Sequence, residues 1–553
     1  MTTNGNQLAN QHTEIYEHLE RVGFKLMSHQ KEGIKWMLER ELLTNQSLSH
    51  GPFKNIRGGL LCDDPGLGKT IQTCATLFGN KKNRTLIIAP TLNILKQWVD
   101  TIEKILPDSN ICIHHGTKKL KSVNELNYNK YDIILATLPM IYEKKVPNVL
   151  NSILWDRVVI DEIHYIKNSS SKSFKGAEKL SSTIKWGLTG TPIQNKVKDI
   201  QTLYRYVFST INGPDIENKK WAQGYIELMN THFLKRRQKS TVTSLKKLND
   251  NIEIFSSSTG FDTEEERNIY ITIKNNIIKE YMAMENTHTN SEKMMVVLGL
   301  ILRLRQVSIH PQIAINALNK ISTRDNLSNR LMTFKGPSTK FNNILKIVTN
   351  KVALNQNTII FCYFREEMDS LSLFLKENYI DSRLYNGSMS IKEKEKVLKE
   401  FVSPITMKEF KLIYNRLINL SSYDAESAIE RHIPKVLLIQ IKSGGVGLNL
   451  QQFNNVIFTS PDWNPTNQYQ AIARAHRIGQ KMKVNVYNIL INDDNFSTID
   501  DRIRHLQFKK QDIIKKILNE LPTYALLPIT EHDEMYPHQT THDRYLEYTA
   551  ILQ

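Results

Sequence analysis

The 553-residue sequence contains no apolar run close to the roughly 20 residues that cross a bilayer. Its first 20 residues, MTTNGNQLANQHTEIYEHLE, do not show the basic-then-apolar order of a signal peptide. Only four cysteines occur, and none forms a C-x-x-C pair: Cys62, Cys74, Cys112 and Cys362. We therefore expect an intracellular protein without a disulfide framework, a zinc ribbon or a RING.

Acidic residues are fewer than basic ones, 56 against 73, which leaves a formal net charge of +17. An excess of positive charge is the electrostatic footprint of a nucleic-acid partner, although a solvated basic surface would produce the same balance. The length is too great for one hydrophobic core, so we expect two or more domains.

Short apolar runs alternate with helix-like segments in two parts of the chain. Residues 84–90, 131–137, 155–162 and 184–191 have the composition of buried parallel strands, and so do 357–364, 382–387, 434–441 and 454–460. We predict an α/β fold with two lobes, each a parallel sheet flanked by helices. The functional site of such a sheet lies at the carboxyl ends of its strands.

The domain boundaries follow from these changes of pattern. We predict a polar extension over 1–25, a first lobe over 26–200, helical insertions and a linker over 201–335, a second lobe over 336–510, and a C-terminal helix and tail over 511–553. Within the second lobe, 402–433 is an insertion with two amphipathic helices. It is either a tolerated surface insertion or a docking platform for a partner. The His/Asp-rich tail favours a solvated segment over a metal site, because its spacing is irregular.

The stretch GGLLCDDPGLGKTIQT (58–73) contains the end of a phosphate-binding pattern, although Asp63 stands where the first glycine is usual. Such a loop needs backbone N–H groups, a lysine for the phosphate charge and a hydroxyl for Mg²⁺. We predict a nucleotide-binding loop at the start of a helix, formed by Asp63, Asp64, Pro65, Gly66, Leu67, Gly68, Lys69 and Thr70.

A pair of carboxylates, Asp161 and Glu162, ends the apolar run of VVIDEIH (158–164). One carboxylate of such a pair can hold Mg²⁺ while its neighbour orients and deprotonates the attacking water. A strand-end acidic pair without a role is the alternative. The phosphate loop before it and LTGTP (188–192) after it favour the catalytic interpretation.

The motifs together resemble a superfamily-two helicase-type motor, and more narrowly a Swi/Snf-type DNA translocase with two RecA-like lobes and an ATP cleft. The segments that carry the resemblance are LMSHQKEGIKWML (26–38), LIIAPTLNILKQW (86–98), LTGTPIQN (188–195), FLKRRQKS (233–240), RLRQVSIHP (303–311), SGGVGLNLQQFNNVIFTSPDWNP (443–465), QAIARAHRIGQ (470–480) and STIDDRI (497–503). The chain is most similar to the branch of transcription-termination factors (lodestar) and RING-bearing repair translocases. The cysteine count argues against a RING.

The resemblance implies a role for each matching position. Gln30 would read the adenine, Lys69 and Thr70 would hold the β- and γ-phosphates and Mg²⁺, Asp161 would hold Mg²⁺, and Glu162 would be the catalytic base. Arg474 and Arg477 would be arginine fingers, and Gly447 a further nucleotide contact. Thr189, Gly190 and Thr191 would couple hydrolysis to movement. The backbone-tracking positions for DNA would be Pro90, Thr91, Thr137, Gly387, Lys442, Ser443 and Asn464.

Some positions depart from the family pattern. Ile163 replaces an alanine, Lys394 replaces an arginine and so loses a bidentate donor, and Ser460 replaces an aspartate. We expect Trp463, which could stack on a base, to be a packing residue instead. None of these positions touches the phosphate chemistry.

The implied function is a DNA-dependent ATPase that uses ATP and Mg²⁺, translocates on double-stranded DNA, and displaces or remodels bound protein. RNA polymerase or another DNA-bound complex is the expected partner, and we expect a monomer located at DNA, in a nucleus or at a viral replication site. A strand-separating DNA or RNA helicase is one alternative. A catalytically inactive DNA-binding scaffold is another, but Lys69, Glu162, Arg474 and Arg477 are all present.

Overall fold

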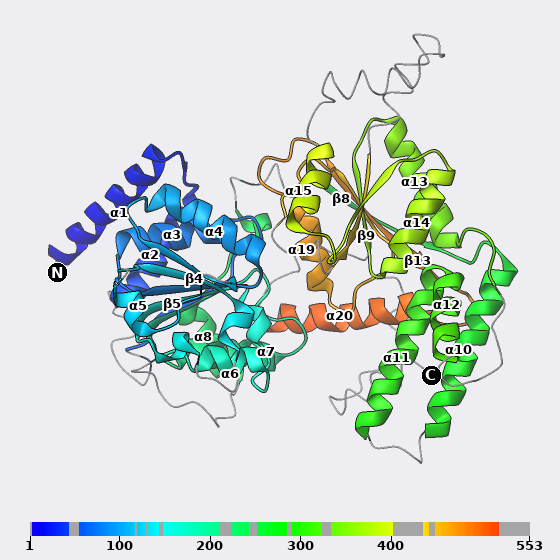
Figure 1. Ribbon diagram of the computed structural model, residues 1–553, viewed down its shortest axis with the longest axis horizontal. Helices are drawn as coiled ribbons and strands as arrows, with labels where there is room; N and C mark the ends of the chain where they lie inside the picture. Colours follow the sequence, from blue (N-terminus) through cyan, green and yellow to red (C-terminus); the bar gives the residue numbers. More distant parts are fainter. Residues whose placement is uncertain are drawn as a thin grey trace, which may run out of the picture. The chain divides into compact units, whose positions relative to one another are not determined.

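The computed structural model describes residues 3–43, 53, 55–116, 119–128, 130–142, 148–210, 223–242, 245, 251–284, 290–322, 333–401, 435–441 and 448–518. The chain divides into two compact units, 1–249 with 510–523 and 250–509 with 524–553 (Figure 1). The predicted insertion over 402–433 and the tail beyond 518 lie outside the described residues. No helix among the described residues is both long enough and apolar enough to span a bilayer.

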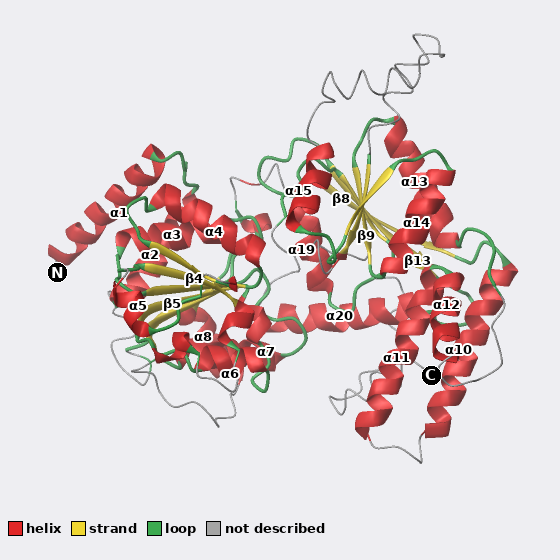
Figure 2. Ribbon diagram, in the orientation of Figure 1, coloured by secondary structure: helices red, strands yellow, loops and turns green. Residues whose placement is uncertain are grey.

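The first unit contains a parallel sheet with the strand order β3-β4-β2-β5-β6-β1-β7. Its strands are β1 (Arg57–Leu61), β2 (Thr85–Ala89), β3 (Ile111–His114), β4 (Ile133–Thr137), β5 (Trp155–Asp161), β6 (Ser182–Leu188) and β7 (Leu234–Lys235). The central strands β2, β4 and β5 are almost wholly buried, because helices cover both faces of the sheet (Figure 2).

The helices of the first unit are α1 (Thr3–Arg21), α2 (Ser28–Leu42), α3 (Lys69–Gly79), α4 (Leu92–Ile105), α5 (Val123–Tyr128), α6 (Lys172–Glu178), α7 (Val197–Phe208) and α8 (Gln223–Phe233). Short 3-10 helices are η3 (Leu138–Ile141), η4 (Val149–Ser152), η5 (Ile163–Ile166) and η6 (Lys239–Thr241). Helix α1 falls in the polar extension expected over 1–25, yet it buries Ile15 and Leu19. A Cβ on Gly79 of α3 would lie 2.5 Å from Ile15 Cδ1, so the two helices touch closely.

A buried ion pair attaches α2 to the sheet. Arg157 Nε on β5 donates to Glu41 Oε1 at 2.6 Å, and Trp186 Nε1 on β6 donates to the same oxygen at 2.8 Å. Glu41 and Arg157 are 0% and 1% exposed, so each charge depends on its partner. The pair holds the helix that contains Gln30 against the strands that lead to the site.

The second unit contains another parallel sheet, with the order β10-β11-β9-β12-β13-β8. Its strands are β8 (Ile252–Thr259), β9 (Thr358–Cys362), β10 (Ser382–Tyr385), β11 (Val436–Gln440), β12 (Asn455–Phe458) and β13 (Val484–Ile491). Successive residues of β9 enter different cores: Ile359 and Phe361 join one apolar cluster, and Ile360 and Cys362 join the other.

Helices of the second unit lie on both faces of its sheet, with α13 and α14 on one face and α15 and α19 on the other (Figure 1). They are α10 (Glu264–Met284), α11 (Asn290–Ile309), α12 (Pro311–Ser322), α13 (Thr339–Ala353), α14 (Arg365–Glu377), α15 (Ile391–Glu400), α19 (Pro465–Ala475) and α20 (Ile499–Leu518). Helices α10, α11 and α12 form a separate apolar cluster with the start of α20. The predicted class, two parallel sheets flanked by helices, is confirmed.

Two strands lie in the stretch that was expected to be helical, 201–335. Strand β7 joins the edge of the first sheet beside β1, and β8 pairs along its whole length with β13, from Ile252 opposite Val484 to Thr259 opposite Ile491. The sequence of β8, IEIFSSST, is only partly buried, as is usual for an edge strand. Its apolar signal is therefore weak, and the pairing partner decides its structure.

Candidate nucleotide site

The predicted phosphate loop connects β1 to α3. Gly66 and Gly68 adopt φ values of 92° and 85°, the left-handed region that favours glycine. Gly68 is the N-cap of α3, so the N-terminus of that helix, where backbone N–H groups lack helical partners, faces the loop. The two glycines of the pattern G-L-G-K-T are therefore explained by the backbone conformation of the loop.

Gln30 lies against this loop from α2. Its Nε2 donates to Leu67 O at 3.3 Å, and its Oε1 accepts from Met27 N at 3.0 Å. A Cβ on Gly68 would lie 2.3 Å from Gln30 Nε2, so a larger residue would displace the amide. The structure thus places the predicted adenine-reading residue beside the predicted phosphate loop.

Lys69 and Thr70 are the first two residues of α3. The Lys69 ammonium donates to the backbone carbonyl oxygens of Asp63 and Asp64, at 2.6 and 3.4 Å. Thr70 is partly buried in the same turn. A cation and a hydroxyl at a helix N-terminus are the groups that an anionic phosphate chain requires.

Asp161 ends β5, and its carboxylate is held by two donors. Trp98 Nε1 on α4 donates to Oδ2 at 2.8 Å, and Glu162 N donates to Oδ1 at 2.9 Å. Burial, and next the neighbouring Glu162 carboxylate, raise the pKa of Asp161 to about 6, while Trp98 and Lys69 oppose this rise. A carboxyl group with such a perturbed pKa is a candidate functional group.

Glu162 adopts φ 50°, a left-handed conformation that few non-glycine residues adopt and that often marks functional sites. Its Oε2 lies 3.3 Å from Thr189 Oγ1 and 3.2 Å from His164 Nδ1. Thr189 Oγ1 also lies 2.9 Å from His164 Nδ1 and accepts from Thr191 N at 3.1 Å. The predicted base and the predicted coupling residues therefore form one hydrogen-bonded group.

Gly190 joins this group to the phosphate loop. A Cβ on Gly190 would lie 2.6 Å from Pro65 Cδ, so the two backbones are in close contact. Consequently Thr189, Gly190 and Thr191 connect the predicted base on one side with the phosphate loop on the other, as the strand order β5-β6-β1 requires.

The predicted DNA-contacting residues of the first unit follow neighbouring strands. Pro90 and Thr91 come directly after β2, and Thr91 Oγ1 caps α4 by accepting from Ile94 N at 3.5 Å. Thr137 is the last residue of β4, and its buried hydroxyl lies 3.2 Å from His115 Nδ1. All three lie at the carboxyl edge of the sheet.

The second unit contains the other predicted residues. Arg474 lies on α19, and Arg477 follows the end of that helix, where burial lowers its pKa. Asn464 caps α19 by accepting from Thr466 N at 3.1 Å, and Gly387 lies in an exposed turn after β10. Lys442, Ser443 and Gly447 lie outside the described residues.

Two family profiles cover most of the chain. Residues 29–313 match the SNF2-related domain, and residues 419–479 match the helicase conserved C-terminal domain. The chain belongs to the SNF2-related family. The predicted family is thereby confirmed. The predicted enzyme class, an ATP hydrolase, agrees with this family and with relatives that are named ATP-dependent helicases.

Relatives of this SNF2-related chain include proteins of a bacterium, a virus and an insect. An uncharacterized ATP-dependent helicase of Mycoplasma genitalium is 28% identical over 90% of this chain and 42% of the relative. A probable global transactivator of Orgyia pseudotsugata multicapsid polyhedrosis virus is 27% identical over 89% of this chain and 91% of its own length. Transcription termination factor 2 of Drosophila melanogaster is 24% identical over 92% of this chain and 59% of its own length, in line with the predicted branch. The chain thus spans about half the length of two of these relatives and nearly all of the viral one.

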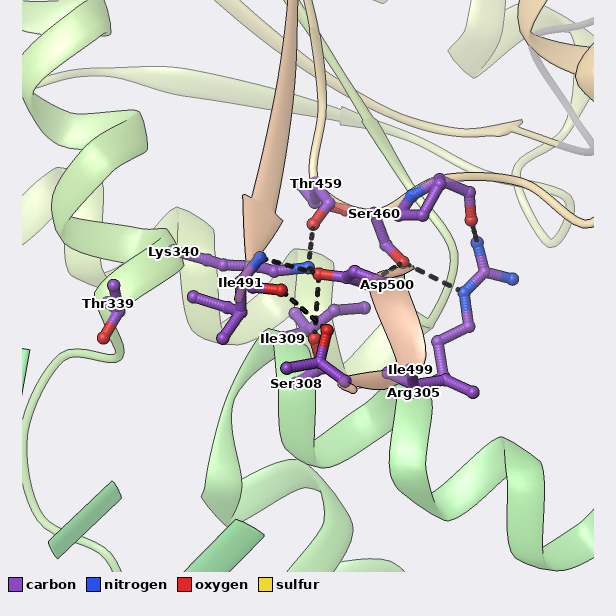
Figure 3. A network of polar contacts seen from close by, with 12 residues as sticks. Arg305, Ser308, Ile309, Thr339, Lys340, Thr459, Ser460, Ile491, Ile499 and Asp500 are labelled. Atoms are coloured by element: carbon purple, nitrogen blue, oxygen red, sulfur yellow. Dashed lines mark hydrogen bonds and ion pairs between the residues drawn. The ribbon is translucent and has the colours of Figure 1, made fainter. Parts of the chain in front are cut away.

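The family's aspartate is replaced by Ser460, and a neighbouring carboxylate lies beside it (Figure 3). Asp500 on α20 has Oδ1 3.4 Å from Ser460 Oγ, and Arg305 Nε on α11 donates to the same hydroxyl at 3.2 Å. Lys340 Nζ on α13 pairs with Asp500 at 2.6 Å and donates to Thr459 O at 2.9 Å. The strand end before α19 is therefore held by polar groups from three helices.

The structure also describes the two other positions that depart from the family pattern. Lys394 Nζ lies over the Tyr385 ring, 5.6 Å from its centroid, and Ile163 is fully buried. Trp463 packs against the apolar cluster of α10 and α11, which supports the packing interpretation.

Several residues of the SNF2-related site were missed from the sequence. Trp98 and His164 lie inside quoted motifs, but no local pattern identifies them as partners of Asp161 and Glu162. Arg236 and Arg237 lie in the quoted segment FLKRRQKS (233–240), but no role was predicted for them. A sequence signal exists only for His164, a polar side chain three residues after the buried strand β5 ends; Trp98, Arg236 and Arg237 are identified by contacts that form on folding.

Proposed function

We propose that this chain is a DNA-dependent ATPase that translocates on double-stranded DNA and remodels or displaces bound protein. The observation that carries the proposal is the group formed by Lys69, Asp161, Glu162 and Thr189 around a loop of left-handed glycines. This group has a cation for phosphates, a metal-type carboxylate and a base linked to a neighbouring motif.

The donor set suits Mg²⁺ bound together with a nucleotide. Mg²⁺ is usually held by one or two carboxylates and substrate phosphates, and Asp161 and the Thr70 hydroxyl supply the protein oxygens. When bound, the ion would neutralise charge on the phosphates. Lys69 would hold the β- and γ-phosphates, Gln30 and Gly447 would contact the nucleotide, and Glu162 would orient and deprotonate the attacking water.

In this proposal Arg474 and Arg477 stabilise the charge that develops on the γ-phosphate. Arginine fingers contribute roughly 10³–10⁵ in rate where they have been tested. Lys69 belongs to the first unit and both arginines to the second. Thr189, Gly190 and Thr191 would transmit the change because they touch both the base and the loop.

The proposed track is the DNA backbone. Pro90, Thr91 and Thr137 at one sheet edge, and Gly387, Lys442, Ser443 and Asn464 in the second unit, would contact phosphates without reading bases. The net charge of +17 supports a polyanionic partner, and binding should weaken steeply with salt. A relative named transcription termination factor 2 supports RNA polymerase, or another DNA-bound complex, as the displaced partner. We propose a monomer that acts at DNA, in a nucleus or at a viral replication site.

The test is the ATPase rate without nucleic acid and with single-stranded DNA, duplex DNA or RNA. Stimulation by duplex DNA supports the proposal, and stimulation by RNA alone contradicts it. Lys69→Ala and Glu162→Gln should abolish the stimulated rate while leaving DNA binding largely intact.

A second assay separates translocation from strand separation. The chain should displace the third strand of a DNA triplex in an ATP-dependent reaction without unwinding a duplex of the same length. Unwinding without triplex displacement would identify a strand-separating helicase, and DNA binding without ATP hydrolysis or displacement would identify a binding scaffold.

A further inference from the structure

The start of the phosphate loop lies beside a segment that is far away in sequence. Strand β7 pairs with β1, and the pairing continues past the strands: Cys62 N donates to Lys235 O at 2.7 Å, and Asp64 N donates to Arg237 O at 3.0 Å. Residues 234–238 therefore run as an extended chain along the loop, and η6 begins at Lys239. Successive side chains of an extended chain point to opposite sides, so Arg236 and Arg237 can bracket the loop.

Arg237 binds the residue that replaces the first glycine of the usual pattern. Its Nε donates to Asp63 Oδ1 at 2.9 Å, and its NH2 pairs with the other carboxylate oxygen. The Asp63 side chain is 0% exposed. A fork of this kind is the strong, geometrically specific form of a charged hydrogen bond, and its loss would leave a buried charge without a partner.

The same guanidinium reaches both helices that flank the site. Its NH2 donates to Gln72 Oε1 on α3 at 2.8 Å, and its NH1 donates to the backbone carbonyl of His29 on α2. Gln72 Nε2 in turn donates to Asp63 Oδ2 at 3.1 Å. One side chain thus links the loop, the helix that begins at Lys69 and the helix that contains Gln30.

Glycine at position 33 of α2 makes room for this arrangement. A Cβ there would lie 1.8 Å from Gln72 Oε1 and 2.6 Å from Arg237 NH2. The close approach needs a residue without a side chain, so the sequence of α2 accommodates the arginine.

Arg236 holds the other side of the loop. Its NH1 donates to Cys62 O at 2.8 Å and to Gly190 O at 2.9 Å, and its NH2 lies 3.5 Å from Asp64 Oδ1. Lys239 N donates to the second oxygen of Asp64 at 3.0 Å. Both carboxylates of the Asp63–Asp64 pair are therefore held by segment 234–239.

We propose that Arg237 is a positioning residue for the nucleotide site, with Arg236 as its counterpart on the other side of the loop. The inference rests on the proposed function. In most phosphate loops a glycine permits the first turn, whereas here a side-chain network sets it. Arg237 would fix the distance between the Gln30 helix and the phosphate loop, so that both parts of one nucleotide can be bound together.

The experiment compares full-length Arg237→Gln, Arg237→Lys and the double variant Arg237→Gln/Asp63→Asn. The dissociation constant of N-methylanthraniloyl-ADP, the ATPase KM and kcat, and the melting temperature are measured for each. Glu178→Gln is the matched control, because it removes the partly buried partner of Arg205, at 2.8 Å, which none of the contacts described above links to the loop.

Arg237→Gln should weaken binding of the ADP analogue and raise the KM by about 10- to 100-fold, the range for removing supporting partners at metal sites. It should lower kcat less than it raises the KM. Arg237→Lys should recover part of the affinity, and the double variant should bind better than the single one, since it no longer buries an unpaired carboxylate. Glu178→Gln should match the wild type.

The outcomes distinguish a failure of the proposed function from a failure of the inference about Arg237. If the wild type does not bind the analogue, the proposed function fails. If the wild type binds the analogue, and folded Arg237→Lys and the double variant bind it as tightly as the wild type does, Arg237 has only a structural role. The inference is then overturned. A lower melting temperature with unchanged affinity leads to the same conclusion.

Discussion

The buried pair Lys340–Asp500 offers a direct test of how the second unit is held together. Both side chains are 0% exposed, and the ammonium and carboxylate lie 2.6 Å apart. Asp500 also accepts from Ser308 Oγ at 3.1 Å and from Ile491 N at 3.0 Å (Figure 3). Asp500→Asn keeps the size of the side chain but leaves the Lys340 ammonium buried without a counter-charge.

The expected cost follows from that burial. Breaking a buried ion pair by removing one partner typically costs about 3–5 kcal/mol, because the remaining charge is uncompensated. Burial already lowers the pKa of Lys340, and the Asp500 carboxylate opposes that effect. Removing both charges with Lys340→Met/Asp500→Asn should cost less than Asp500→Asn alone, which makes the two effects strongly non-additive.

The assay is hydrogen exchange followed by mass spectrometry on the full chain, since a protein of two units need not unfold in one step. Peptides from α13 and from the start of α20 should exchange faster in Asp500→Asn. At about 1.4 kcal/mol per factor of ten, a loss of 3–5 kcal/mol corresponds to roughly a 10²- to 10³-fold or larger increase.

The matched control is Glu253→Gln. The pair Lys483–Glu253 has the same separation, 2.6 Å, but its side chains are 54% and 46% exposed. An exposed pair contributes about 0–1 kcal/mol, so exchange should change by less than tenfold. Equal effects of Asp500→Asn and Glu253→Gln would refute the reasoning that burial decides the contribution.

Three further predictions concern the first unit. The pKa of Asp161 is about 6, so Mg²⁺-dependent binding of an ADP analogue should weaken as the pH falls below that value. Trp98→Phe removes a donor to the carboxylate and should therefore move the loss of binding to higher pH. An unchanged midpoint of the binding-against-pH curve would contradict the assignment. Gly68→Ala should abolish ATPase activity with little change in DNA binding, because φ 85° strains alanine and its Cβ would meet Gln30; wild-type turnover would exclude the proposed loop. Burial lowers the pKa of Lys185 to about 7, so the unfolded chain binds an extra proton between pH 7 and about 10.5, and stability should rise with pH across that window. Lys185→Met should remove this rise in melting temperature. A pH profile of melting temperature identical to that of the wild type would show that another group is responsible.

The sequence alone determined the class of fold, and it predicted which residues form the candidate site. Buried parallel strands leave a local apolar signature, and their carboxyl ends meet at one edge, where the family resemblance predicts roles for Lys69, Asp161, Glu162 and Thr189. The sequence is also informative about the backbone at Gly66 and Gly68, because the left-handed conformation that both adopt favours glycine over other residues.

Only the tertiary structure decided which side chains hold that site in place. Trp98 contacts Asp161 and Arg237 contacts Asp63 across separations of 63 and 174 residues. In the second unit, Asp500 likewise contacts Ser460 across 40 residues. The edge strands β7 and β8 likewise depend on partners elsewhere in the chain. The periodicity and spacing of residue types predict the local structure of a segment. A hydrogen bond between distant segments, by contrast, forms only once the chain has folded and water is excluded from both groups.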